Sequence, residues 1–212
     1  MKKIFVLVTL FVLPVVVYLF FASGVYNFGK LPILTENIVN VSNFDGAVSL
    51  ENKITVLGFM GNDVTGKKGN AFNLNQKIYK RFYEFNDFQF VMIASKGMNA
   101  QAEELKKELA GITNAEKWNF VFLSNADTKT LFESLQTNFT LDEDLATPYV
   151  FIIDKENNLR GRDDDEDEDE GAKYGFNSTS VADLNNKMVD DVMIMLAEYR
   201  LALKKNNADR TK

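Results

Sequence analysis

The sequence predicts an α/β fold in which a mixed sheet is flanked by helices and preceded by one N-terminal transmembrane helix. Four short apolar segments alternate with helical periods, an uncharged stretch opens the chain, and a polar turn near residue 156 predicts a closing hairpin. The chain has 212 residues, of which 46% are hydrophobic and 25% charged. This composition is ordinary for a protein with a folded core.

The uncharged stretch covers residues 4–22 and follows Lys2 and Lys3. A helix of this length is about 28 Å long, close to the ~30 Å hydrocarbon core of a bilayer. We expect residues 1–24 to form a retained single-pass membrane anchor, and the alternative is a cleaved signal peptide. The two lysines indicate an anchor in the inner (cytoplasmic) membrane, with the rest of the chain in the periplasm or an equivalent outer compartment.

Residues 25–53 are expected to be a tether with one edge strand or hairpin, because Pro32 and polar residues interrupt short apolar pieces. The domain is expected to span residues 54–205, and a polar tail follows at 206–212. Its four core strands are apolar on both alternating faces, as strands covered by helices on both sides must be. They are predicted at residues 54–60, 88–94, 118–123 and 149–154.

Apolar residues spaced three or four apart predict helices between these strands. Those residues are Ala71, Leu74, Ile78, Phe82 and Phe85, then Ala102, Leu105 and Leu109, then Leu131 and Leu135 after a possible N-cap at Asp127. A turn at 155–158 then leads to a short partner strand at 159–162. The last helix has an apolar stripe and begins with a capping-box pattern of Ser180 and Asp183. Its stripe is Val181, Leu184, Met188, Val192, Met195, Tyr199 and Ala202. The predicted order is β-α-β-α-β-α-β-β-α.

The composition excludes several classes of function. The sequence has no Cys and no His, so it cannot form disulfides, metal sites built on thiolate or imidazole, or Cys-His and Ser-His catalytic groups. We therefore expect no cofactor and no enzymatic activity. The net charge is −6, but eight acids form one run at 163–170, so the rest carries +2. Because the sequence has no basic patch large enough to follow a phosphate backbone, nucleic acid is not an expected partner.

Three segments resemble the Sco/SenC family, membrane-anchored thioredoxin-like proteins that assist copper delivery to cytochrome c oxidase. They are VLGFMG at 56–61, WNFVFL at 118–123 and TPYVFIIDKENNLRGR at 147–162. With the single N-terminal anchor, the resemblance covers about residues 34–205. It implies a thioredoxin-like fold, with Thr147-Pro148 where such folds carry a cis-proline. It also implies respiratory-complex or other envelope proteins as partners.

That family binds copper through Cys-x-x-x-Cys in the loop after the first core strand and a His before the hairpin strand. The matching segments, 61–70 and 144–148, contain none of these ligands, and Cu(I) requires sulfur or imidazole. The resemblance therefore implies a binding or assembly factor without copper or thiol chemistry. In this fold the two segments lie side by side. The expected partner-binding residues are Asn62, Asp63, Thr65, Thr147 and Pro148.

The segment Gly61-x4-Gly66-Lys67 nearly matches a phosphate-binding loop, but Lys68 replaces the hydroxyl residue that would hold Mg²⁺. We interpret it as a surface loop whose amides and lysines would favour an anion if it binds a ligand.

The acidic run is expected to be a solvated, mutually repelling loop. It lacks the spacing of a calcium-binding EF-hand, but Asp163, Asp165 and Asp167 are weak Ca²⁺ or Mg²⁺ candidates. Two alternative functions follow: a cation-responsive protein that uses this loop, or an enzyme with unrecognised carboxylate or anion chemistry.

Overall fold

The computed structural model describes residues 2–22, 30–168 and 171–210, although it describes only part of the side chains in the first helix and none beyond residue 202. Its centre is a seven-stranded sheet with strand order β1-β6-β5-β2-β3-β4, and β7 also pairs with β5. The strands are β1 (Ile33–Thr35), β2 (Ile54–Gly61), β3 (Phe88–Ser95), β4 (Trp118–Leu123), β5 (Ala146–Ile153), β6 (Leu159–Arg160) and β7 (Phe176–Asn177).

The sheet is mixed, as predicted. β2, β3 and β4 run parallel, whereas β5 is antiparallel to β2. β5 and β6 form the predicted hairpin, and Asn157 takes a positive φ of 62° in its turn. β5 begins at Ala146 and not at Tyr149, because residues before Pro148 already pair with the end of β2.

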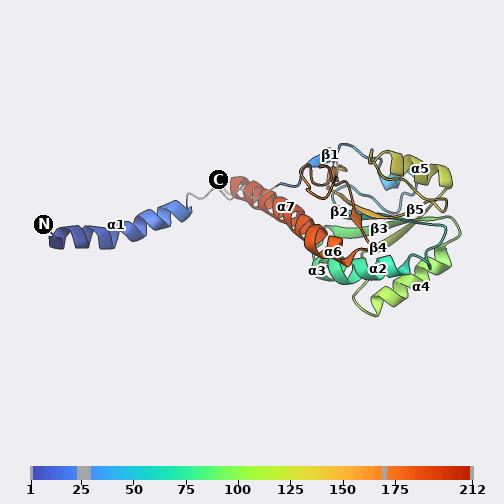
Figure 1. The fold of residues 1–212 in the computed structure, drawn as a ribbon, viewed down its shortest axis with the longest axis horizontal. Helices are drawn as coiled ribbons and strands as arrows, with labels where there is room; N and C mark the ends of the chain where they lie inside the picture. Colours follow the sequence, from blue (N-terminus) through green and yellow to red (C-terminus); the bar gives the residue numbers. More distant parts are fainter. Residues whose placement is uncertain (1, 23–29, 169–170, 211–212) are drawn as a thin grey trace.

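Helices cover both faces of the sheet (Figure 1). They are α2 (Lys68–Leu74), α3 (Lys80–Phe82), α4 (Asn99–Ala110), α5 (Asn125–Glu133), α6 (Val181–Asp183) and α7 (Val189–Arg210), together with the 3-10 turn η1 (Val41–Asn43). Two π-helical turns, η2 (Asn75–Tyr79) and η3 (Leu184–Met188), join α2 to α3 and α6 to α7. The segments from α2 to α3 and from α6 to α7 are therefore each one helix interrupted by a π turn.

Two apolar cores result from this arrangement. One core packs α2 to α4 and η3 to α7 against the sheet around the fully buried Trp118 and Phe90. The other packs α5 against the opposite face. Ile38, Val41 and Leu50 belong to this second core, so most of the expected tether packs on the domain and contributes an edge strand, β1.

Several local predictions were wrong. The N-cap of α5 is Ser124, whose hydroxyl accepts the amide of Asp127, so Asp127 is the third helical residue and not the cap. Phe85 lies beyond the end of α3, and Val181 lies in the first turn of α6, where both side chains are exposed. Ser180 does cap the last helix, because its hydroxyl accepts the amide of Asp183.

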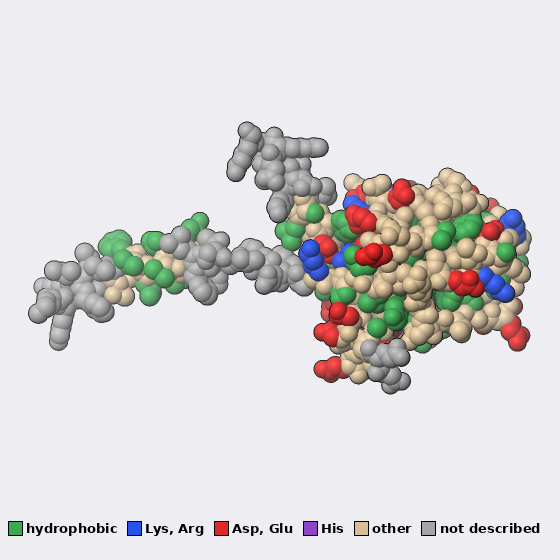
Figure 2. Space-filling view, turned by 90° about the horizontal axis from the view of Figure 1, so that it is seen from above, with side chains coloured by type: hydrophobic (Ala, Val, Ile, Leu, Met, Phe, Trp, Pro, Cys, Tyr) green, Lys and Arg blue, Asp and Glu red, His purple; other side chains and the backbone are tan. Residues whose placement is uncertain are grey.

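The predicted anchor coincides with α1 (Lys2–Ala22), an apolar helix that contains Pro14. Figure 1 shows α1 outside the body of the domain, and Figure 2 shows green apolar side chains along it. Among the described residues, no helix meets the length and apolarity expected of a membrane span. Residue 1, residues 23–29, and several side chains of α1 lie outside the described residues, so the anchor remains a prediction.

The register of the sheet defines two ends of the domain. Met60 pairs with Ala146 at the end that we name the loop end, from which the loop 61–70 leaves. Thr55 pairs with Ile153 at the other end. The chain enters the domain at this end. There the carbonyl of Leu31 accepts a hydrogen bond from the Nε of Arg160 at 2.8 Å. We name this the tether end, and a strand of this length separates it from the loop end by about 20 Å.

Candidate functional site

The loop 61–70 begins at Gly61, where β2 ends in a left-handed conformation with a φ of 60°. A Cβ atom at this position would lie 1.9 Å from the carbonyl oxygen of Asp144. The next amide, of Asn62, donates to the same oxygen at 2.9 Å. Glycine is therefore required for the loop to contact the segment before β5. The structure brings together the two segments that the sequence predicts to be neighbours.

Side-chain hydrogen bonds fix the shape of this loop. The Oδ1 of Asp63 accepts the amide of Gly66 at 2.8 Å, and the side chain of Val64 is buried beneath them. The amide and hydroxyl of Thr65 both donate to the Oε1 of Gln101 on α4, each at 3.1 Å. Because the amides of Thr65 and Gly66 already have partners within the protein, they are not free to bind an anion.

Both lysines of the loop are held by carboxylates. Lys67 lies 3.3 Å from Asp142, and Lys68 lies 2.8 Å from Glu108. Burial acts to raise the pKa of Asp142, but hydrogen bonds from the Ala146 amide and from Lys67 outweigh it, so the pKa lies below its ordinary value. The expected attraction for an anion is thus reduced by neighbouring acids.

The second segment at the loop end is Thr147-Pro148, which lies in β5. The described residues contain no cis peptide bond, so the expected cis-proline is trans here. Pro148 lies where the pairing of β2 with β5 shifts between Gly58 and Met60, and its carbonyl accepts the amide of Ser178 at 2.9 Å. A proline without an N–H fits such an irregular ladder position.

The two segments enclose a cleft of only about 20 Å³, lined among others by Met60, Lys67, Met92, Thr147 and Ser178. This volume holds about one water molecule, not a substrate. Of the expected partner-binding residues, only Thr147 lines this cleft, and its side chain is buried. Asn62, Asp63 and Thr65 are exposed on the loop, and Pro148 is half-buried. The expected residues therefore lie on the two segments that meet at the loop end, but they do not surround one cleft.

The residues of this cleft do not fit the copper of the Sco/SenC family. The oxygen ligands available are the amide of Asn70 and the hydroxyls of Thr147 and Ser178, which suit hard cations and not Cu(I). Met60 and Met92 are the soft side chains present, but both are buried in the sheet core. The ammonium group of Lys67 beside them would also repel a cation.

The acidic run is solvated in part, because Asp163, Asp164, Glu166 and Asp167 are exposed as predicted, but cations of the domain hold other acids of the run. Asp165 is 6% exposed, and its Oδ1 lies 2.5 Å from the Nζ of Lys187, which also contacts Asp167 at 2.7 Å. The amide of Asp165 donates to Gly171 across the run. Opposite charges on η3 therefore neutralise carboxylates that would otherwise repel one another. Residues 169–170 lie outside the described residues.

Two further cations anchor the run to the domain. Arg162 makes a bidentate contact with Asp191 on α7, with Nε to Oδ2 at 2.9 Å and Nη2 to Oδ1 at 2.8 Å. Lys173 lies 3.1 Å from Glu168 and 3.2 Å from Asp183. Burial raises the pKa of Asp191, although the hydrogen bond from Arg162 opposes this shift. Of the three cation candidates, Asp165 and Asp167 already have lysine as their partner.

Within the described part of the chain, no group of three or more acidic side chains is arranged to hold a metal ion. The sequence pattern did not identify Gln101 and Lys187, which hold the loop and the acidic run in place. Each is far along the chain from its partner, and no local pattern marks it.

The sequence matches no protein-family model and no curated protein sequence. The structure is similar to a SCO1/SenC family lipoprotein from Bacillus anthracis str. Ames, with a TM-score of 0.50 and 17% identity over 79% of this chain and 98% of that one. A putative electron transfer protein from Aquifex aeolicus VF5 has 13% identity over 79% and 98% of the two chains, with a TM-score of 0.48. The soluble domain of Sco1 from Bacillus subtilis has 14% identity over 79% and 96%, with a TM-score of 0.42. At these identities the similarity concerns the fold, which is thioredoxin-like and Sco-like.

Proposed function

We propose that this protein is a membrane-anchored binding or assembly factor with a Sco-like domain and without copper or thiol chemistry of its own. The observation that carries the proposal is the loop end. The loop 61–70 presents exposed polar residues at this end, Pro148 is half-buried, and the cleft between the two segments measures only about 20 Å³. Such a surface suits contact with another protein better than binding of a small substrate.

A role without chemistry is supported by the residues at this surface. The sequence has neither Cys nor His, and the lysines of the loop are paired with Asp142 and Glu108. A nucleophile with an adjacent base, or a set of soft metal ligands, would be needed for the usual activities of such a loop. We therefore propose binding, and not catalysis, as the activity of the loop end.

The anchor is proposed to be α1, inserted once in the inner membrane with the domain in the periplasm or an equivalent outer compartment. Support comes from the large apolar side chains that α1 exposes on all sides, which water disfavours. They are Val6, Leu10, Phe11, Val12, Leu13, Val15, Val16, Val17 and Tyr18. Lys2 and Lys3 at its N-terminal end support the orientation.

Respiratory-complex or other envelope proteins are the proposed partners, a suggestion that rests on the Sco/SenC resemblance. The test is to isolate tagged full-length protein from its native membrane in mild detergent and to identify the co-purifying proteins by mass spectrometry. Asn62→Arg should reduce their recovery, because its side chain is exposed at the loop end and makes none of the contacts that hold the loop.

Asn185→Arg is the matched control, since it adds the same charge at an exposed position of the π turn η3. Partners that co-purify equally with both variants would overturn the proposed surface. Terminal oxidase subunits or copper-handling proteins among the partners would place the protein in the pathway of its structural relatives. Other envelope proteins would indicate a binding factor outside that pathway.

A further inference from the structure

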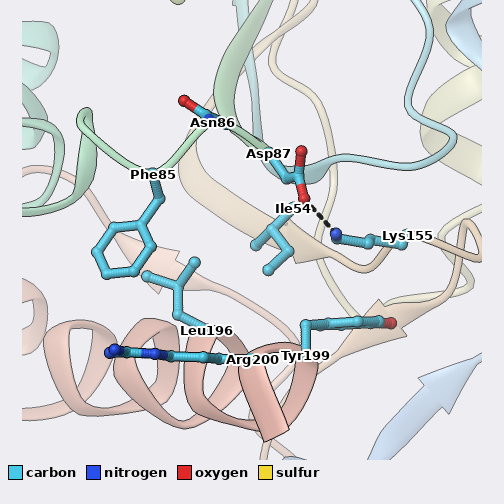
Figure 3. Close-up of a pocket in the computed structure, with 8 residues that line it drawn as sticks. All are labelled: Ile54, Phe85, Asn86, Asp87, Lys155, Leu196, Tyr199 and Arg200. Carbon is cyan, nitrogen blue, oxygen red and sulfur yellow. Dashed lines mark hydrogen bonds and ion pairs between the residues drawn. The ribbon is translucent and has the colours of Figure 1, made fainter. Parts of the chain in front are cut away.

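The tether end of the domain contains a second cleft, which the proposed function does not use. Its volume is about 260 Å³, and it lies between α7, the turn before β3 and the start of β2. Figure 3 shows its residues: Ile54, Phe85, Asn86, Asp87, Lys155, Leu196, Tyr199 and Arg200. We name it the tether-end cleft. It is about 20 Å from the loop end, so it is separate from the proposed partner surface.

The middle of this cleft is apolar. Ile54 and Leu196 form its inner wall, and Phe85, whose side chain is 41% exposed, covers one side (Figure 3). A cavity of about 150 Å³ can hold benzene, whereas typical ligand pockets begin near 300 Å³. The cleft therefore has room for one short chain or ring, not for a nucleotide or a haem.

The charged side chains lie at the two ends of the cleft. Among the described side chains, one of the two cations has no carboxylate partner. The carboxylate of Asp87 is 2.5 Å from the Nζ of Lys155, the ion pair drawn at one end in Figure 3. The ring of Tyr199 contacts Lys155 from the other side, with its centroid at 5.2 Å. Arg200 lies along α7 at the opposite end, and it forms no ion pair or hydrogen bond with any described side chain.

We propose that the tether-end cleft binds a medium-chain alkyl carboxylate, with the chain on Ile54, Phe85 and Leu196 and the carboxylate on Arg200. A guanidinium group binds a carboxylate through two parallel hydrogen bonds. The cleft presents polar groups at its rim but none across its apolar middle. A peptide would leave amide groups unpaired there, whereas an alkyl chain has none to satisfy.

The position of the cleft suggests where such a ligand comes from. Ala22 ends α1 and Lys30 begins the described domain, so at most about 29 Å of chain separates them. If α1 is the anchor, the tether end stays close to the bilayer, which contains acyl chains and releases fatty carboxylates. This source rests on the proposed function, whereas the ligand chemistry rests on the cleft alone.

The test uses the full-length protein in phosphatidylcholine nanodiscs and an octanoate analogue with a diazirine on its last carbon. After irradiation, cross-linked peptides are identified by mass spectrometry, with unlabelled octanoate as competitor. We expect labels within residues 85–87 and 196–200 that octanoate removes. Arg200→Gln should lower labelling about tenfold, the effect of losing one charged hydrogen-bonding partner.

Two control variants separate charge recognition from a change in the domain. Arg200→Lys keeps the cation and should retain most of the labelling, and Arg81→Gln removes an exposed arginine elsewhere and should leave it unchanged. The neutral octanamide analogue should label as weakly as Arg200→Gln does. Labelling outside the cleft, or labelling that Arg200→Gln leaves unchanged, would overturn the proposal.

Two further outcomes distinguish the occupant and its source. Competition by acetyl-leucine but not by octanoate would replace the fatty carboxylate with a peptide C-terminus and overturn the assignment. Cleft labelling in a chain that does not remain with the nanodisc would contradict the anchor and the bilayer source while supporting the ligand chemistry. The failure of the proposed function and that of the cleft can therefore be told apart.

Discussion

The guanidinium of Arg160 lies 3.0 Å from the carboxylate of Asp154 in the interior of the domain, where both side chains are at most 5% exposed. Arg160 also contacts Glu198 on α7 at 2.8 Å and the carbonyl of Leu31. One side chain thus joins the hairpin, the last helix and the point where the chain enters the domain. Asp154 accepts the amide of Asn158 at 2.8 Å and so closes the turn between β5 and β6.

Removing Arg160 should be strongly destabilising. Arg160→Met leaves the charge of Asp154 buried without a counterion, which costs about 3–5 kcal/mol in comparable sites. Urea unfolding is measured by the fluorescence of Trp118, the single tryptophan, which is fully buried. Arg81→Met is the control on an exposed arginine. If Arg160→Met changes the free energy of unfolding by less than about 1 kcal/mol, the structural role of the pair is contradicted.

Gly61 and Gly69 provide a matched pair of substitutions. Gly61→Ala should destabilise the domain by at least about 1–3 kcal/mol, because φ is 60° and the added Cβ would meet the carbonyl of Asp144. Gly69→Ala adds the same atom in α2 where nothing lies within 4 Å, so it should stabilise by about 0.5–1 kcal/mol. Thermal unfolding measures both. Equal effects of the two substitutions would show that the loop does not need its glycine.

The acidic run should depend on pH through Asp165. Burial raises the pKa of Asp165, but the hydrogen bond from Lys187 and other cations outweigh it, so the pKa is below its ordinary value. A carboxylate with a lowered pKa stabilises the folded state above about pH 4, the range of an unfolded aspartate, and this contribution disappears as the pH falls further.

Lys187→Met should therefore cost about 1–3 kcal/mol at pH 7, because it removes the closest cation from buried Asp165 and leaves Arg162 at 3.7 Å. The difference from the starting protein should be smaller at pH 3, because proton binding to Asp165 becomes more favourable as the pH falls. Urea unfolding at the two pH values is the measurement, and the exposed Lys129→Met is the control. A difference that is equal at both pH values would exclude this ion pair as its cause.

The order of elements could be read from the sequence because strand and helix periods are local. The four core strands, the closing hairpin and the cap at Ser180 follow from residues within a few positions of one another. Met195 and Met188, on the predicted stripe, are fully buried. The end of a helix is less certain, since Phe85 continues the period after α3 has ended.

The contacts that organise the site could not be read in the same way. Lys187 neutralises Asp165 from 22 residues away, and Gln101 holds Thr65 from 36 residues away. The sequence shows eight adjacent acids and predicts repulsion, whereas the fold supplies the cations. The tether-end cleft likewise combines residues from β2, the turn before β3, the turn between β5 and β6, and α7, which share no sequence pattern.

The membrane topology can be tested directly because the chain has no native cysteine. Lys30→Cys places a thiol at an exposed residue at the start of the domain. An outer location predicts that a membrane-impermeant maleimide labels this thiol in intact cells, and a retained anchor predicts that the labelled protein keeps its N-terminus and floats with membranes. Labelling only after lysis would place the domain on the cytoplasmic side.

The central claim is that the loop end binds a partner in the membrane environment. A photoreactive benzophenone residue in place of Asn62, and in a second variant in place of Asn185, allows full-length protein to be cross-linked in its native membrane. The account predicts the same one or few envelope proteins cross-linked at position 62 and absent at position 185. No cross-linked protein at position 62, or the same set at both positions, would contradict it.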